Sequence, residues 1–126
     1  MDRRVVPLAM ILQLNTRLFR NCLDGLTEEQ ASLRPSDTTN SAVFVAAHLA
    51  DSRFFLLRAL GAERPTPLAR YLDGPRSIDE VDQNPPLDVI ATAWGVLIFL
   101  VQHDGYHDGQ LALLRKYAGL PAMKYA

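Results

Sequence analysis

The stretch that most restricts the fold of this chain lies between residues 87 and 118, where apolar residues recur every three or four positions. That spacing matches one face of an α-helix and differs from the strict alternation of a half-buried strand. No stop signal occurs before Gly119-Leu-Pro121, so the sequence predicts a helix from Pro86 or Leu87 to Ala118. At 1.5 Å per residue this helix would be about 48 Å long.

A helix of that length is long for a compact domain of this size, whose radius of gyration should be about 14 Å. Either it kinks or breaks near Gly95, or it stays long and packs against a second copy of the chain. Residues 96 to 101 are apolar on every face, so a single neighbouring helix would not cover them. We therefore expect a long helix in a homodimer. The alternative is that the connection 62–86 covers the extra face.

Further helical segments precede this one. A first helix is predicted over residues 4–24, and a short second one starts at the capping box Thr27-Glu-Glu-Gln30 and ends before Pro35. After a polar turn, Asn40 or Ser41 is expected to cap a helix that runs to about Leu60 and stops at Gly61. The inward stripe expected for this helix consists of Val45, His48, Leu49, Ser52, Phe55, Leu56 and Ala59.

Residues 62–86 contain five of the eight prolines and have no long apolar periodicity. We expect an irregular connection there, with short helical turns at 68–72 and from Ser77.

Composition narrows the class of protein. The length of 126 residues fits a single domain over 1–126, and a net charge of −1 gives no electrostatic reason to expect nucleic acid or an anionic membrane as a partner. The most apolar run, 89–101, is shorter than the roughly 20 residues of a membrane span. A single cysteine, Cys22, excludes an intramolecular disulfide, and it is expected to be a small buried hydrophobe. With no signal-peptide pattern, these features predict a cytoplasmic protein.

The three histidines carry the functional hypothesis. His103 and His107 lie one helical turn apart, so both rings can reach one metal ion. His48 lies on the inward stripe of another helix and completes a set of three neutral imidazoles, with one position left open for water or substrate. A pair of histidines four residues apart also arises by chance. The alternative is therefore a bundle whose histidines are packed without metal.

Residues near the histidines have weaker signals. Asp51, one turn after His48, is the first candidate for a proton acceptor or a carboxylate that orients a ligand, although a solvated helix charge is an equal alternative. Asp104 and Asp108 directly follow the two histidines of the last helix. Each should point about 100° away from its neighbour, which predicts surface or interface positions.

Four more residues of the last helix are of interest. Tyr106 is expected either to line a pocket or simply to pack, and Gln110 is close enough in sequence to His107 to reach the rim of the site. Gly105 and Gly109 form a smooth strip that would let another helix approach closely, unless both are merely tolerated.

These residues resemble a known family. The segment Val101-Gln-His-Asp-Gly-Tyr-His-Asp-Gly-Gln-Leu-Ala-Leu-Leu-Arg115, with Gly119-Leu-Pro, is similar to the last helix of the DinB/YfiT-like superfamily. Asn40-Ser41 and Ala46-Ala-His-Leu-Ala-Asp51 resemble its second helix, and Leu26-Thr-Glu-Glu-Gln fits its start. The resemblance covers most of the chain.

The resemblance implies an all-α, four-helix up-down-down-up bundle that is often dimeric. It also implies a site for a divalent ion such as zinc, nickel or iron, which would be held here by His48, His103 and His107. Members are regarded as metal-dependent hydrolases or as transferases that use low-molecular-weight thiols. Residues 62–86 depart from the pattern because they are too short and too rich in proline for a full third helix, so a reduced or irregular third helix is expected.

The resulting hypothesis is a metal-dependent hydrolase or thiol-dependent transferase that acts on an unidentified small molecule. A non-catalytic, stress-associated metal-binding module and a metal-free structural bundle are the alternatives.

Overall fold

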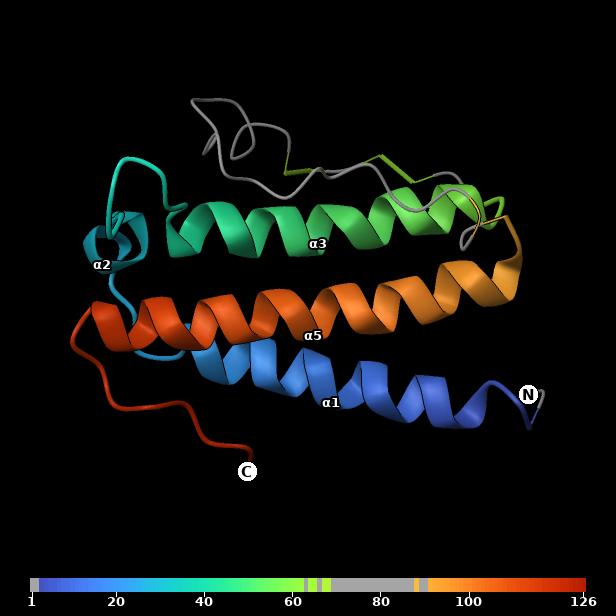
Figure 1. Ribbon diagram of the computed structural model, residues 1–126, viewed down its shortest axis with the longest axis horizontal. Helices are drawn as coiled ribbons and strands as arrows, with labels where there is room; N and C mark the ends of the chain where they lie inside the picture. The colour runs from blue at the N-terminus through green and yellow to red at the C-terminus, as the bar shows by residue number, and fades with distance from the viewer. Residues whose placement is uncertain (1–2, 63, 66, 69–87, 89–90) are drawn as a thin grey trace.

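The computed structural model describes residues 3–62, 64–65, 67–68, 88 and 91–126 (Figure 1). These residues form four helices, α1 (Val6–Leu23), α2 (Glu28–Ser32), α3 (Ala42–Ala59) and α5 (Ala93–Tyr117), and within them there is no strand. The predicted all-α class is confirmed. The expected reduced third helix and the turn from Ser77 lie outside the described residues, as does nearly all of the turn predicted at 68–72.

The three long helices lie alongside one another, with α5 in the middle and in contact with both α1 and α3 (Figure 1). The colour order shows that α1 and α5 run in the same direction and that α3 runs against both. The short helix α2 lies at one end, beside the start of α3. With 25 residues, α5 is about 38 Å long and presents different faces to its two neighbours.

Three of the four helices, α2, α3 and α5, begin at a residue whose side chain caps the first turn. Thr27 and Gln30 form the predicted capping box of α2, with the Gln30 backbone N–H bonding to the Thr27 hydroxyl at 3.1 Å. The Ser41 hydroxyl caps α3 by accepting from the Phe44 N–H. Gly25 follows α1 with a φ of +74°, a conformation that glycine adopts without strain.

The predicted start of the last helix at Pro86 or Leu87 is wrong. The backbone of Thr92 is extended and its hydroxyl accepts a hydrogen bond from the Gly95 N–H at 3.0 Å, so α5 begins only at Ala93. Asp88 and Ala91 lie in turns outside the helix. Gly95 is thus in the first turn of α5, and no internal break is needed there.

The core lies where α1, α3 and α5 meet. Its buried members come from all three helices, and Cys22 on α1 is fully buried, as predicted. Burial raises the pKa of the Cys22 thiol to about 11. The buried core residues are Cys22, Ala42, Val45, Leu49, Leu111 and Leu114.

Two members of the stripe expected to face inward on α3 do not. Phe55 is 42% exposed, and Ala59 is also exposed. Val45, Leu49 and Leu56 of that stripe are buried as expected. The stripe therefore faces the core in its first half and leaves it towards the end of α3. Among the described helices, none combines the length and apolarity needed to cross a membrane.

Candidate metal centre

The structure brings His48, His103 and His107 together. The Nε2 atom of His103 lies 3.2 Å from the Nε2 of His48 and 3.2 Å from the Nε2 of His107. One ligand atom from each residue lies within 4.8 Å of the other two. His48 comes from α3 and the other two from α5, so the cluster joins helices that are distant in sequence.

Local helix geometry explains why the rings converge. His103 and His107 are separated by one turn of α5, and their ring centroids are 4.4 Å apart. His48 projects from the facing helix, with its ring centroid 4.7 Å from that of His107 and 5.2 Å from that of His103. His107 is buried, and the other two are partly exposed.

The spacing of the nitrogens fits a metal ion. With Zn–N bonds of 2.0–2.1 Å and tetrahedral angles, two ligating nitrogens should lie about 3.3 Å apart. Two of the three nitrogen pairs are 3.2 Å apart. The three histidines could therefore hold a divalent ion and leave one position open.

The protonation state of His103 also suits a ligand. Burial, followed by repulsion from His107 and His48, lowers the pKa of His103 to about 3. Its imidazole is therefore neutral at physiological pH, and a neutral imidazole is the form that binds metal. The Nδ1 atom of His103 is buried and has no hydrogen-bond partner among the described residues.

Gln110 orients the third ring. Its Oε1 lies 2.6 Å from His107 Nδ1, and its Nε2 donates to the Tyr106 hydroxyl at 3.3 Å. With the amide held this way, His107 Nδ1 is the donor, and the lone pair of Nε2 points to the cluster. The expectation that Gln110 reaches the site is met. Tyr106 is 47% exposed and packs edge-on against the His107 ring.

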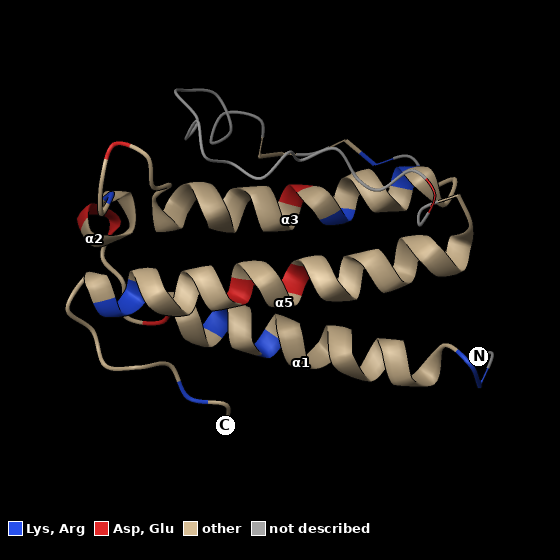
Figure 2. Ribbon diagram, viewed as in Figure 1, with Lys and Arg blue, Asp and Glu red and all other residues tan. Residues whose placement is uncertain are grey.

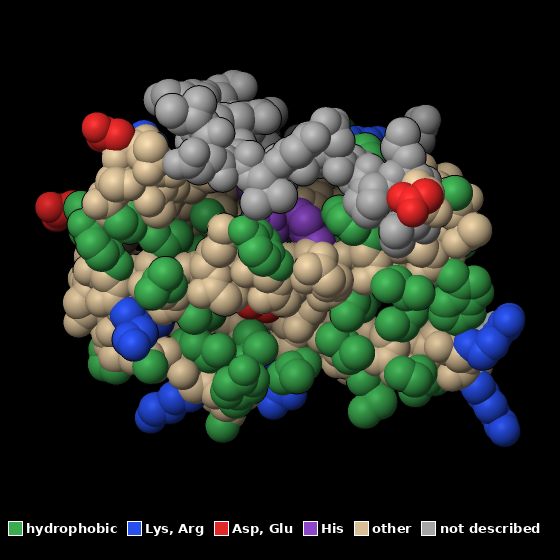
Figure 3. All heavy atoms as spheres, in the orientation of Figure 1, with side chains coloured by type: hydrophobic (Ala, Val, Ile, Leu, Met, Phe, Trp, Pro, Cys, Tyr) green, Lys and Arg blue, Asp and Glu red, His purple; other side chains and the backbone are tan. Residues whose placement is uncertain are grey.

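A hollow of about 200 Å³ adjoins the histidines on the side between α3 and α5. His48, His103 and Asp51 contribute to its walls. The Oδ1 atom of Asp51 is buried and has no hydrogen-bond partner among the described residues. Figure 3 shows the histidine side chains at the surface between α3 and α5. A small molecule in the hollow would therefore lie beside both the imidazoles and one carboxylate.

The prediction that Asp104 and Asp108 are surface or interface residues is wrong. They are 0% and 4% exposed, respectively, and stand in an otherwise uncharged part of α5 (Figure 2). Because α5 is covered by both α1 and α3, a second face 100° from the histidines is also buried.

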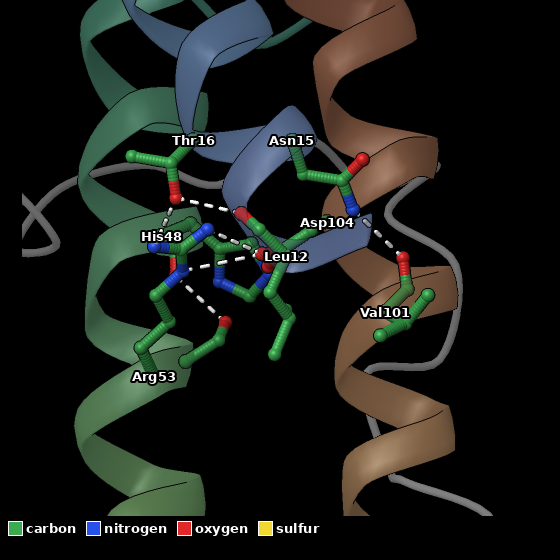
Figure 4. A network of polar contacts seen from close by, with 8 residues as sticks. Leu12, Asn15, Thr16, His48, Arg53, Val101 and Asp104 are labelled. Atoms are coloured by element: carbon green, nitrogen blue, oxygen red, sulfur yellow. Dashed lines mark hydrogen bonds and ion pairs between the residues drawn. The ribbon is translucent and has the colours of Figure 1, made fainter. Parts of the chain in front are cut away.

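Arg53 of α3 compensates one of these two charges. Its Nη2 lies 2.6 Å and its Nε 3.2 Å from Asp104 Oδ2, and its Nη1 donates to the Thr16 hydroxyl at 3.0 Å (Figure 4). Nearby, the Asn15 amide donates to the Val101 carbonyl at 3.1 Å. This polar network links all three long helices one residue away from His103, a member of the histidine cluster.

Asp108 has no such partner. Both of its carboxylate oxygens are buried without a hydrogen bond from the described residues. Burial, reinforced by the negative charge of Asp104, raises the pKa of Asp108 to about 7. Near neutral pH, this side chain is therefore partly protonated inside the core.

No described helix packs against the smooth strip predicted at Gly105 and Gly109. Both glycines are exposed, and an added Cβ at either position would meet nothing within 4 Å. The close helix approach expected there is not made by α1 or α3.

The fold and the site together define a helical bundle with a three-histidine cluster between two of its helices. The chain belongs to the DinB superfamily, whose family model matches residues 11–89, more than half of its length. Searches of curated proteins and of solved structures give no match. The matched segment contains His48 but ends before His103 and His107, so the convergence of the three rings is evidence separate from the family match.

Sequence reasoning missed the Arg53–Asp104 network. The available signal was the repeat His-Asp-x-x-His-Asp over residues 103–108, which places two aspartates on one stripe beside the histidine stripe. Recognising that stripe as buried required knowing that α5 lies between two helices.

Proposed function

We propose that this protein is a metal-dependent enzyme whose ion is held by His48, His103 and His107, and that hydrolysis is its leading activity. The observation that carries the proposal is the set of three ring nitrogens within 4.8 Å, beside a hollow of about 200 Å³. Three imidazole ligands leave a fourth coordination position for water or substrate.

A bound divalent ion would act as a Lewis acid, lowering the pKa of water or of a thiol at the open position. The protein must then supply a group that accepts the released proton. Asp51 is suited to this task because its carboxylate shares the hollow with His48 and His103, and its Oδ1 accepts no hydrogen bond from the described residues. In hydrolysis, Asp51 would act as the general base towards the bound water.

A thiol-dependent transferase is the second candidate. Phe55, Leu56 and Phe99 give the hollow walls with more apolar than polar surface, which suits the carbon skeleton of a thiol or of its electrophilic partner. In that reaction, Gln110 and the helix backbones would keep the imidazoles in place, and Asp51 would take the thiol proton.

The first experiment is metal analysis of protein purified without a histidine tag, compared with His48→Ala and Asp51→Asn variants. We expect about one ion per chain in the wild type, a large loss in the histidine variant and retention in the aspartate variant. A wild type that takes up no divalent ion would refute the metal centre and leave a structural bundle.

Activity screens on the metal-loaded protein then separate the remaining functions. Ester and amide substrates test hydrolysis, and thiols paired with electrophiles test transfer. Hydrolysis that falls by two to four orders of magnitude in Asp51→Asn, with the metal retained, would support the proposed base. A fully loaded protein that is inactive in both screens would instead be a non-catalytic metal-binding module.

A further inference from the structure

We infer that the hollow beside the histidines binds small, elongated carboxylates, with the carboxylate at Arg58 and the opposite end of the molecule at the histidines. This inference names the ligand class of the proposed metal centre and so rests on that proposal. It is carried by the charges and rings that line the hollow.

The lining residues of α3 are arranged along the helix axis. His48, Phe55 and Arg58 all border the hollow, and the last lies ten residues beyond the first. At 1.5 Å per residue their Cα atoms are about 15 Å apart along the axis. The hollow therefore extends along α3 as a trough, bordered by the histidines towards one end and by Arg58 towards the other.

The middle of the trough is apolar. Phe55 comes from α3 and is 42% exposed, although a phenylalanine at this position would ordinarily be expected to pack into the core. Phe99 faces it from α5, with its ring centroid 5.5 Å from that of His103. Two rings on opposite helices offer stacking surfaces to an aromatic or other flat ligand.

The charges of the trough favour an anion at its far end. Arg58 makes no side-chain hydrogen bond or ion pair with any described residue, so its guanidinium is available to a carboxylate. Asp51 lies seven residues earlier, near the histidines. A divalent ion at the histidines would offset the charge of Asp51 and leave the charge of Arg58 for the ligand.

A matched pair of probes tests the inference. 4-(Mercaptomethyl)benzoate carries a donor group, a ring and a carboxylate, and 4-methylbenzyl mercaptan lacks only the carboxylate. Both would be titrated by calorimetry into metal-free and zinc-loaded protein. We expect the carboxylate probe to bind at least about tenfold more tightly in both forms, as for a charge-assisted hydrogen bond.

Two arginine variants test whether Arg58 causes the preference for the carboxylate probe. Arg58→Gln should abolish the difference between the probes while leaving the affinity of the neutral probe unchanged. Arg64→Gln is the matched control, because Arg64 is also exposed but does not line the hollow, and it should keep the preference. Equal affinities for the two probes, or a preference that survives in Arg58→Gln, would overturn the inference.

The two forms of the protein keep this test separate from that of the metal centre. If the protein takes up no zinc, the proposed centre fails, and a carboxylate preference that depends on Arg58 in the metal-free protein would still support the trough. If zinc loading strengthens the binding of both probes equally and the carboxylate probe is not preferred, the trough inference fails and the metal centre stands.

Discussion

Replacing Arg53 with alanine should strongly destabilise the protein, because Asp104 is then fully buried without its cation and must either bear an uncompensated charge or take up a proton. Arg53 makes two contacts with Asp104 Oδ2, at 2.6 and 3.2 Å, and one with Thr16. Breaking a fully buried ion pair costs about 3–5 kcal/mol. The Arg53 side chain is 32% exposed, so water screens part of the pair, and we expect a loss of about 2–3 kcal/mol.

The assay is urea unfolding of metal-free protein at pH 7.5, with Arg58→Ala as the control. Arg58 lies on the same helix but is exposed, so its substitution should change the free energy of unfolding by no more than about 0.5 kcal/mol. A loss below about 1 kcal/mol in Arg53→Ala would show that the Arg53–Asp104 pair is not a main link between α3 and α5.

The same variant has a predicted pH dependence. Burial raises the pKa of Asp104, and Arg53 opposes that rise, so removing Arg53 should raise this pKa further. The folded variant would then hold a proton that the unfolded chain has lost. The loss of unfolding free energy relative to the wild type, called the deficit here, should therefore grow as pH increases. At a pH low enough to protonate Asp104, the deficit should shrink. A deficit that does not change with pH would contradict the buried charge as its cause.

Further consequences follow from other residues. Asp108→Asn should stabilise the protein above pH 7 by about 1–4 kcal/mol, since the pKa of Asp108 in the folded protein, about 7, exceeds its ordinary value of 3.8. The gain in stability should vanish near pH 4. Urea unfolding at a series of pH values measures it. Cys22 should react with iodoacetamide only as fast as the protein opens, because the thiol is buried and its pKa is raised to about 11; labelling as rapid as that of free cysteine would contradict this. Gln110→Ala should weaken zinc binding about 10–100-fold in a competition titration by freeing the His107 ring, and an unchanged affinity would contradict its orienting role. The homodimer remains a prediction, consistent with the exposure of Ile98 (52%) and Met10 (64%) on α5 and α1; light scattering of a monomer at micromolar concentration would refute it.

Much of the helical layout could be predicted because the deciding interactions are local. The capping box at Thr27 and the glycines after α1 and α3 act within a few residues, so their effect can be read from the chain. The start of α5 was missed because apolar periodicity extends upstream of Thr92. The extended backbone of Thr92 and the cap made by its hydroxyl fix the start of α5 at Ala93, whatever the apolar pattern before it.

The histidine cluster was predictable for a similar reason. The spacing of His103 and His107 fixes their common face, and the stripe on α3 places His48 inward. Asp104 and Asp108 were misjudged because periodicity gives the angle between two side chains but not which faces a neighbouring helix will cover. Here α1 covers the face that one helix partner alone would leave in water.

A zinc titration of the wild type and of His48→Ala tests whether α3 and α5 together hold one metal ion. If imidazoles from α3 and α5 share one ion, the wild type should bind one zinc per chain, and loss of the α3 ligand should weaken binding by at least about 100-fold. Zinc bound equally well by His48→Ala would contradict the claim, since the ion would then depend on α5 alone or lie elsewhere.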